Sequence, residues 1–134
     1  MEQYFKISFA AIATVLVDIV GGLDVALQVL LIMITIDYLT GLCKAFYLGV
    51  VSSREGAKGF IKKLVILGVV AMATQLDRLI VDNYHVIRTG IIYFYVANEG
   101  ISIIENLALM GIPIPEFIKN KLIQIKSSEL PKGE

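Results

Sequence analysis

The sequence predicts an all-α membrane protein with about four transmembrane helices and a short amphipathic helix near its C-terminus. Of the 134 residues, 57% are hydrophobic and only 18% are charged, and the mean hydropathy is +0.77. A soluble domain of this size carries fewer apolar and more charged residues. Four apolar runs approach the length of about 20 residues that a bilayer requires. They cover residues 4–20, 25–48, 64–81 and 90–112.

The first two runs are expected to form a tight hairpin. Gly21 and Gly22 separate them, and Asp24 is well placed to cap the N-terminus of the second helix. The first run also resembles the apolar core of a signal peptide, but we expect it to stay uncleaved.

Polar segments border the third run on both sides. Ser52 and Glu55 have the spacing of a capping box, and the amphipathic stretch 54–63 that follows them leads into the run. Residues 82–88 are expected to form a short polar turn before the fourth run.

The C-terminal segment has a different pattern. Pro113 and Pro115 are expected to end the fourth helix. Apolar side chains alternate with lysines over residues 116–126, which is typical of an amphipathic helix on a membrane surface, and residues 127–134 are expected to be frayed. The chain therefore divides into a transmembrane domain over residues 1–112 and a cytoplasmic amphipathic tail over residues 113–134.

The basic residues predict the orientation, because Lys and Arg accumulate in cytoplasmic loops. They gather before the third run and in the tail, as Arg54, Lys58, Lys62, Lys63, Lys119, Lys121, Lys126 and Lys132. Four spans with both termini in the cytoplasm satisfy this distribution, whereas three spans would place the N-terminus outside. The connection before the third run is also expected to contact anionic lipid.

The fourth run carries a polar face. Its residues fall within roughly one third of a helix circumference at about 100° per residue. They are Asn98, Glu99, Ser102, Glu105 and Asn106. A central carboxylate costs about 2.5 to 3.5 kcal/mol on insertion, so this face needs other helices, other copies of the chain or a water-filled cavity against it. Polar residues placed in this way usually mark a pathway through the membrane.

Charged residues inside the other runs have separate interpretations. Asp37, near the middle of the second run, is expected to pair across helices or face a polar cavity, or else to be a buried residue bonded to a neighbouring polar group. Lys44 lies about 10 Å further along the helix axis, too far to pair with Asp37 directly, and is expected to snorkel to the headgroups. Asp77 and Arg78 are interpreted as interfacial anchors.

Small residues recur at the spacing of helix contacts. Gly41, Ala45 and Gly49 form such a series on the second helix, and Gly68 begins one on the third. We favour packing within one chain over a dedicated oligomerisation face for both series.

Conventional enzyme chemistry finds little support. The chain has 12 basic and 12 acidic residues, so its net charge of zero does not suggest nucleic acid as a partner. His85 is the single histidine and Cys43 the single cysteine, which excludes most catalytic triads and most metal sites. Residues 56–59 lack the spacing of a phosphate-binding loop. We expect no catalytic residue, no metal and no cofactor.

Several short motifs together carry a family resemblance. In order they are IDYLTG at residues 36–41 with Lys44, SS at 52–53, GxKGxxKK at 56–63, QLD at 75–77, NEGxSIxEN at 98–106 and GxPxP at 111–115. Their order and spacing resemble the toxin secretion and phage lysis holin family over about residues 30–122.

That resemblance implies a small protein of a phage or prophage that oligomerises in the bacterial cytoplasmic membrane. At a set time it would open lesions through which an endolysin, or in some relatives a toxin, passes as cargo. Two other classes stay open. A regulated ion channel or small transporter would use the same carboxylates without passing a folded protein, and an antiholin or membrane scaffold would oligomerise without permeabilising.

Overall fold

The computed structural model of the chain describes residues 1–80 and 85–129. Within these residues the chain is all-helical, as predicted. The helices are α1 (Glu2–Ile19), α2 (Val25–Leu48), α3 (Ser53–Leu79), α4 (Val86–Leu109) and α5 (Glu116–Glu129). Residues 81–84 and 130–134, which belong to the expected third run, polar turn and frayed end, lie outside the described residues.

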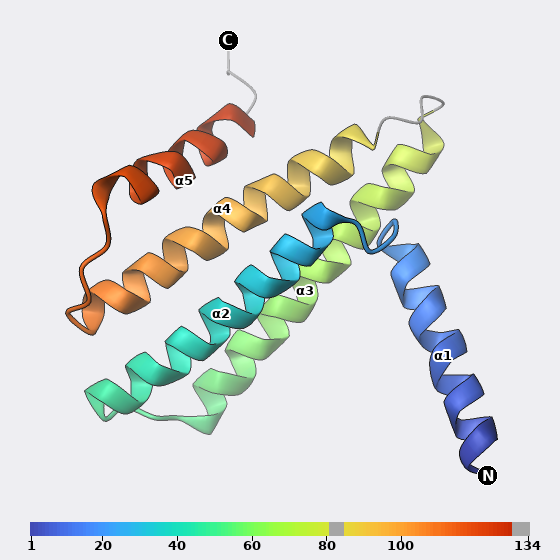
Figure 1. The fold of residues 1–134 in the computed structure, drawn as a ribbon, viewed down its shortest axis with the longest axis horizontal. Helices are drawn as coiled ribbons and strands as arrows, with labels where there is room; N and C mark the ends of the chain where they lie inside the picture. Colours follow the sequence, from blue (N-terminus) through green and yellow to red (C-terminus); the bar gives the residue numbers. More distant parts are fainter. Residues whose placement is uncertain (81–84, 130–134) are drawn as a thin grey trace.

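The helices α2, α3 and α4 form a bundle in which α2 and α4 run parallel and α3 runs antiparallel to both (Figure 1). The end that contains residues 49–63, with most of the basic connection, is called the basic end below, and the end that contains residues 20–24 and 85–88 is called the far end. α4 packs against α2, α3 and α5. α1 leaves the far end at an angle and buries none of its own residues.

The predicted caps form at both ends of the bundle. The Asp24 carboxylate accepts a hydrogen bond from Leu27 N at 3.0 Å, and the Ser52 hydroxyl accepts one from Glu55 N at 3.4 Å. Because α3 already begins at Ser53, the amphipathic stretch 54–63 is the first part of this helix rather than a separate element. With 27 residues, α3 is about 40 Å long, longer than the roughly 30 Å hydrocarbon core.

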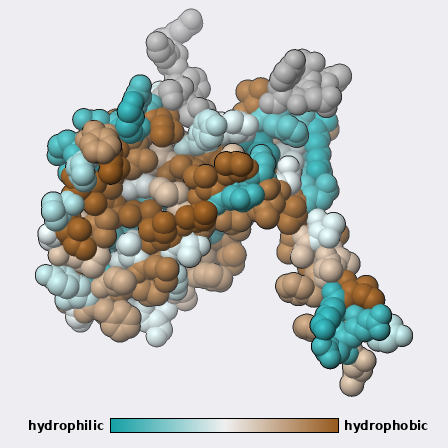
Figure 2. Space-filling view, in the orientation of Figure 1, coloured by the Kyte–Doolittle hydropathy of each residue, from teal (hydrophilic) through white to brown (hydrophobic). Residues whose placement is uncertain are grey.

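The bundle exposes many large apolar side chains and buries several polar and charged ones. Figure 2 shows a broad hydrophobic surface over the helices. Among the described residues, the buried polar or charged ones are Asp37, Thr74, Asp77, Arg88, Glu99 and Asn106. The buried apolar residues are Leu27, Leu30, Ile66, Val70, Ala73, Ile92 and Ala97, and the core that they form lies toward the far end. Apolar side chains outside and paired polar side chains inside suit a protein whose solvent is lipid.

In the described residues, two helices are long and apolar enough on their own to cross a membrane, namely α2 and α3. The short α5 runs back along α4 instead of lying across the end of the bundle (Figure 1). Gly100 permits this close approach, because a Cβ atom there would lie 2.7 Å from Leu122 of α5. The position of α5 therefore differs from that of a helix lying separately on a membrane surface.

Candidate functional site

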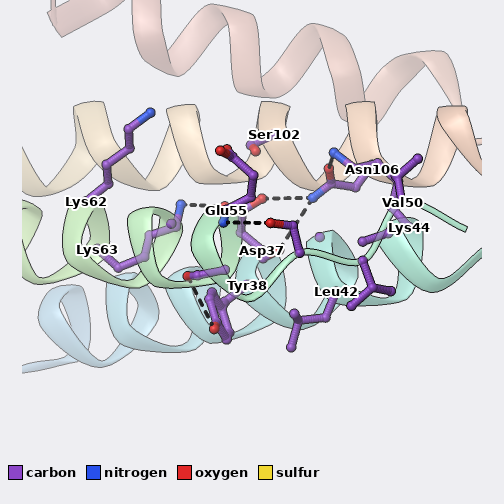
Figure 3. A pocket seen from close by; sticks show the side chains of 16 residues that line it. Asp37, Tyr38, Leu42, Lys44, Val50, Glu55, Lys62, Lys63, Ser102 and Asn106 are labelled. Carbon is purple, nitrogen blue, oxygen red and sulfur yellow. Dashed lines mark hydrogen bonds and ion pairs between the residues drawn. The ribbon is translucent and has the colours of Figure 1, made fainter. Parts of the chain in front are cut away.

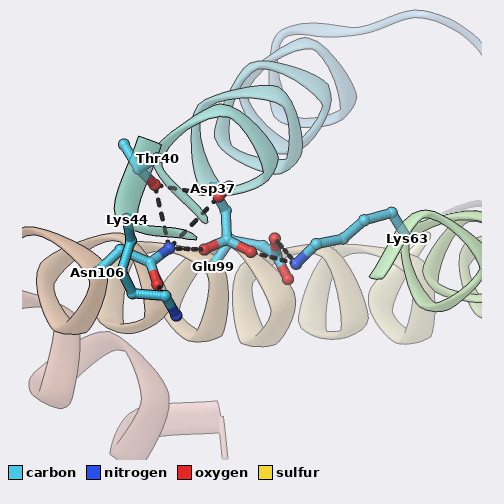
Figure 4. Close-up of polar contacts among 6 residues, drawn as sticks. All are labelled: Asp37, Thr40, Lys44, Lys63, Glu99 and Asn106. Atoms are coloured by element: carbon cyan, nitrogen blue, oxygen red, sulfur yellow. Dashed lines mark hydrogen bonds and ion pairs between the residues drawn. The ribbon is translucent and has the colours of Figure 1, made fainter. Parts of the chain in front are cut away.

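Charged side chains from three helices meet near the middle of the bundle (Figure 4). Lys63 of α3 donates hydrogen bonds to Asp37 of α2 and, at 2.5 Å, to Glu99 of α4. Only 7% of the Asp37 side chain and 6% of the Glu99 side chain are exposed. One lysine thus bridges two carboxylates that are almost fully buried.

Asn106 extends this cluster toward the basic end. Its amide nitrogen donates to the Asp37 carboxylate and to the Thr40 hydroxyl, both at 3.1 Å. Its amide oxygen accepts from Lys44 Nζ at 2.9 Å. The residues Lys44, Asn106, Thr40, Asp37, Lys63 and Glu99 are called the polar network below.

Helix geometry explains how these side chains converge. Asp37, Thr40 and Lys44 follow at intervals of three and four residues, which places them on one face of α2. Glu99 and Asn106 lie seven residues apart, two turns along α4. Gly41 faces Asn106, since a Cβ atom at that glycine would lie 3.7 Å from the amide nitrogen.

The polar network is electrically balanced. Two lysines and two carboxylates alternate along it, with Asn106 as a neutral bridge. Burying an unpaired charge costs several kcal/mol, and pairing with hydrogen bonding offsets much of this cost. No buried side-chain nitrogen or oxygen in the described part of the chain lacks a hydrogen-bond partner. The network therefore lowers the cost of placing α4 within an apolar environment.

A second polar cluster, called the Arg88 junction below, holds the far end together. Arg88 is 2% exposed and donates to Val20 O at 2.6 Å, to Gly22 O at 2.9 Å and to the Asp24 carboxylate at 2.7 Å. Hydrogen bonding from Arg88 holds the pKa of the Asp24 carboxyl below its usual value. A single side chain of α4 thus fixes the connection between α1 and α2.

Asp77 completes the Arg88 junction. Its carboxylate accepts hydrogen bonds from Ile87 N at 3.0 Å and from Arg88 N at 2.8 Å, so it caps the start of α4. Gly21 has φ +85°, and a Cβ atom there would lie 2.6 Å from Arg88 Nε. Both the backbone conformation and the space favour glycine at this position.

A cavity of about 520 Å³ opens at the basic end beside the polar network (Figure 3). It lies between α2, α3 and α4. Polar side chains that line it include Lys44, Lys62, Ser52, Ser102 and Asn106, while Gly41, Gly56 and Gly59 leave it room.

The residues of the polar face expected on α4 differ in burial and fall into three groups. Glu99 and Asn106 are buried in the polar network together with Asp37. Asn98 and Ser102 are half-buried, and Ser102 lines the cavity. Glu105 is exposed. The described single chain therefore brings together three of the six polar candidates.

The small residues expected at helix contacts also have different surroundings. Gly41 faces α4 and Ala45 lines the cavity. Gly49 ends α2 in the left-handed conformation with φ +68°, and a Cβ atom at Gly68 would meet nothing within 4 Å. Of the four residues in the two series, Gly41 is therefore the one that contacts α4 directly.

The basic residues expected to contact lipid have different surroundings. Lys58 pairs with Glu55 at 2.9 Å, and Arg54 and Lys62 are exposed. Lys63 belongs to the polar network. The sequence predicts lipid contact for the basic stretch 54–63 as a whole, but adjacent residues on a helix point about 100° apart, so Lys62 and Lys63 have different surroundings.

Two further functional roles differ from the sequence interpretation. Lys44 donates a hydrogen bond to Asn106, a partner that the sequence did not predict for it. Asp77 is a buried helix cap and not an interfacial anchor, whereas Arg78 is half-exposed and contacts Asp18 at 3.2 Å. Arg88 lies within residues 82–88, for which the sequence predicts a polar turn, but α4 begins at Val86, so that prediction is wrong for residues 86–88. Apolar run length placed the start of the helix at residue 90, because a buried arginine interrupts the apolar pattern of the first turn.

Comparison with known proteins places these features in a family. The model of the bacteriophage holin family matches residues 14–127. A probable holin of Bacillus phage phi105 is 37% identical over 108 residues, which cover 81% of this chain and 79% of the phage protein. An uncharacterized 14.9 kDa protein in the nagH 3′ region of Clostridium perfringens is 41% identical over 127 residues, covering 95% of this chain and 96% of that protein.

An uncharacterized protein of Listeria innocua is 42% identical over 123 residues, covering 92% of this chain and 87% of that protein. No solved structure matches the chain. The family match covers most of the chain, including both the polar network and the Arg88 junction, and so the chain belongs to the bacteriophage holin family.

Proposed function

We propose that this protein is a holin that accumulates in the bacterial cytoplasmic membrane, oligomerises and then opens lesions through which an endolysin reaches the cell wall. Family membership supports a holin-type function. The structural observation that carries the proposal is the polar network. It gives a membrane-embedded bundle a buried and balanced set of charges whose mutual hydrogen bonds could be replaced by hydrogen bonds to water. No catalytic chemistry is involved.

Four membrane spans follow from this proposal. α2 and α3 qualify by their own hydropathy, and α4 is as long as α2 and carries its carboxylate paired with Lys63. α1 is the fourth span, with its exposed apolar side chains in lipid. The basic end and the N-terminus then lie in the cytoplasm, where basic residues accumulate. A cytoplasmic C-terminus requires in addition that α5 leaves the side of α4, against which it packs in the described chain.

The opening mechanism is a change in what surrounds the polar network. In single copies the network is buried between α2, α3 and α4, with the cavity on its basic side. Above a critical density, contacts between copies favour an arrangement in which the polar face of α4 lines water, and hydration then replaces the hydrogen bonds among Asp37, Lys63 and Glu99. Each opened copy favours opening of its neighbours, which makes the event abrupt.

The decisive experiment measures membrane potential and culture turbidity after induction. A holin should leave cells respiring during a lag and then stop growth suddenly, and an uncoupler added during the lag should bring the event forward. A co-expressed endolysin without an export signal should degrade the wall only after that event. Gradual depolarisation from the first minutes, with the endolysin retained, would instead support an ion channel, and oligomers without permeabilisation would support an antiholin or scaffold.

The orientation is tested separately by cysteine labelling. In a Cys43→Ser background, an impermeant maleimide added to intact spheroplasts should label His85→Cys at the far end and spare Lys58→Cys at the basic end. Both side chains are exposed in the folded chain, so burial does not limit either reaction. Labelling of position 58 alone would contradict the proposed orientation.

A further inference from the structure

The cavity at the basic end has an excess of positive charge. Three lysines and two carboxylates line it. One carboxylate, Asp37, is bonded to Lys63, and the other, Glu55, is bonded to Lys58, which stands outside the lining. Lys62 forms no ion pair with any described residue, and the direct partner of Lys44 is the neutral Asn106. The cavity therefore presents two ammonium groups that have no carboxylate of their own.

An apolar groove continues from this cavity along the bundle. Its volume is about 230 Å³, and it lies between α2 and α3, whose mutual contact is less extensive than that of α2 with α4. Tyr38 and Lys63 line both spaces, so the groove and the cavity adjoin. The remaining groove walls are mostly apolar, with Ile34, Leu39, Phe60 and Leu67 among them.

The order of the two spaces matches the order of chemical groups in a lipid. The cavity lies at the basic end, where α3 extends beyond the length that the hydrocarbon core needs. The groove lies nearer the middle of the bundle, at the depth of acyl chains. Small residues at Gly56 and Gly59 keep the cavity open beside Tyr38.

We propose that the cavity and the groove together bind one anionic phospholipid, with the phosphate near Lys44 and Lys62 and one acyl chain between α2 and α3. A free phosphate would leave the groove empty, and a zwitterionic lipid would bring no net charge to the two lysines that lack a carboxylate partner. This inference goes beyond holin function. It needs the bundle to be in a membrane but does not depend on lesion formation.

The test uses the purified full chain in a neutral detergent, with bound lipid counted by native mass spectrometry. Phosphatidylglycerol should bind with a stoichiometry of one and more tightly than phosphatidylcholine with the same acyl chains. Lys62→Gln should weaken phosphatidylglycerol binding about fivefold, the contribution of one basic residue near an anionic headgroup. Arg54→Gln is the matched control, because it removes a basic side chain from the same helix outside the cavity lining and leaves the pair of Lys58 with Glu55 intact, so it should leave binding unchanged.

A second variant tests the groove. Leu39 is half-exposed on the wall of the groove, so Leu39→Trp should fill the groove without disturbing the buried core. It should weaken phosphatidylglycerol binding while leaving binding of inorganic phosphate unchanged, with circular dichroism and elution volume confirming the fold.

Three outcomes would overturn the proposal. Equal binding of the two lipids would indicate a nonspecific surface, and equal losses in Arg54→Gln and Lys62→Gln would indicate diffuse attraction to the basic end. Complete competition by inorganic phosphate, together with no effect of Leu39→Trp, would indicate a phosphate site instead. None of these outcomes bears on the proposed lysis function, which the induction experiment measures independently.

Discussion

The two polar clusters of the bundle are built from different partners. The Arg88 junction bonds to backbone atoms, with Arg88 donating to two carbonyls and Asp77 accepting from two amides. Most hydrogen bonds of the polar network join side chains that project from three intact helices. The apolar core adjoins the first cluster, whereas a cavity adjoins the second.

This difference indicates where the bundle can open. Breaking the Arg88 junction would leave backbone groups of a helix start and of a connection without partners, and no helix could move alone to satisfy them. Breaking the polar network would leave every helix intact, and water entering from the cavity could solvate the separated charges. We therefore expect the far end to stay closed and the basic end to separate first.

The largest effect should follow loss of the Arg88 junction. Arg88→Gln leaves two part-buried carbonyl groups without their donor, which together costs about 2–5 kcal/mol, whereas loss of the pair with the half-exposed Asp24 carboxylate adds at most about 1 kcal/mol. We expect a loss of this size in the free energy of unfolding, measured by titration with a denaturing detergent in mixed micelles.

Arg78→Gln is the control for this change. Arg78 lies at the same end of the bundle, but 44% of its side chain is exposed and its partner is the exposed Asp18. Exposed pairs contribute about 0–1 kcal/mol, so this variant should unfold much like the original protein. Equal losses in the two variants would show that the Arg88 junction is not the structural clamp.

A smaller effect is expected when charges are removed from the polar network. Glu99→Gln or Lys63→Met leaves one unbalanced charge and should each lower the free energy of unfolding by about 1.5–3 kcal/mol. The double variant restores the balance, so its loss should be smaller than the sum of the two by at least about 1 kcal/mol. Strictly additive losses would contradict an energetic link between these residues.

The same variants should change the time of lysis. Glu99→Gln destabilises the sealed arrangement, so lysis should begin earlier after induction. Glu105→Gln removes an exposed carboxylate six residues further along α4, outside the polar network, and should keep the original schedule. If both variants lyse on time, the buried carboxylate serves packing alone.

Sequence patterns predicted the helices better than they predicted the pairs. Apolar run length located α2 almost to the residue, and Asp24 and Ser52 were recognised as caps because capping depends on local spacing. The partner of Asp37 is 26 residues away and that of Arg88 is 64 residues away. Such pairs depend on how helices rotate against one another, which the small contact at Gly41 helps to set and no local pattern encodes.

The smallest expected effect is the pH dependence of the stability that the pair of Asp24 and Arg88 contributes to the Arg88 junction. The pKa of the Asp24 carboxyl is lowered chiefly by its hydrogen bond with Arg88. A lowered pKa in the folded state stabilises the fold above the ordinary carboxyl pKa of about 3.9, and this contribution is lost as the pH falls through the folded-state value. Because 52% of the Asp24 side chain is exposed, solvent screening limits the contribution to at most about 1 kcal/mol.

Asp24→Asn can still accept the capping hydrogen bond from Leu27 N, but it has no charge for Arg88. The original protein should therefore be more stable than Asp24→Asn at pH 7, and the difference should shrink as the pH falls from about 5 to below 4. Unfolding titrations of both proteins across this range would measure it. A difference that is independent of pH would mean that Arg88 holds the far end through its backbone contacts alone, which would sharpen the contrast with the charge-dependent polar network.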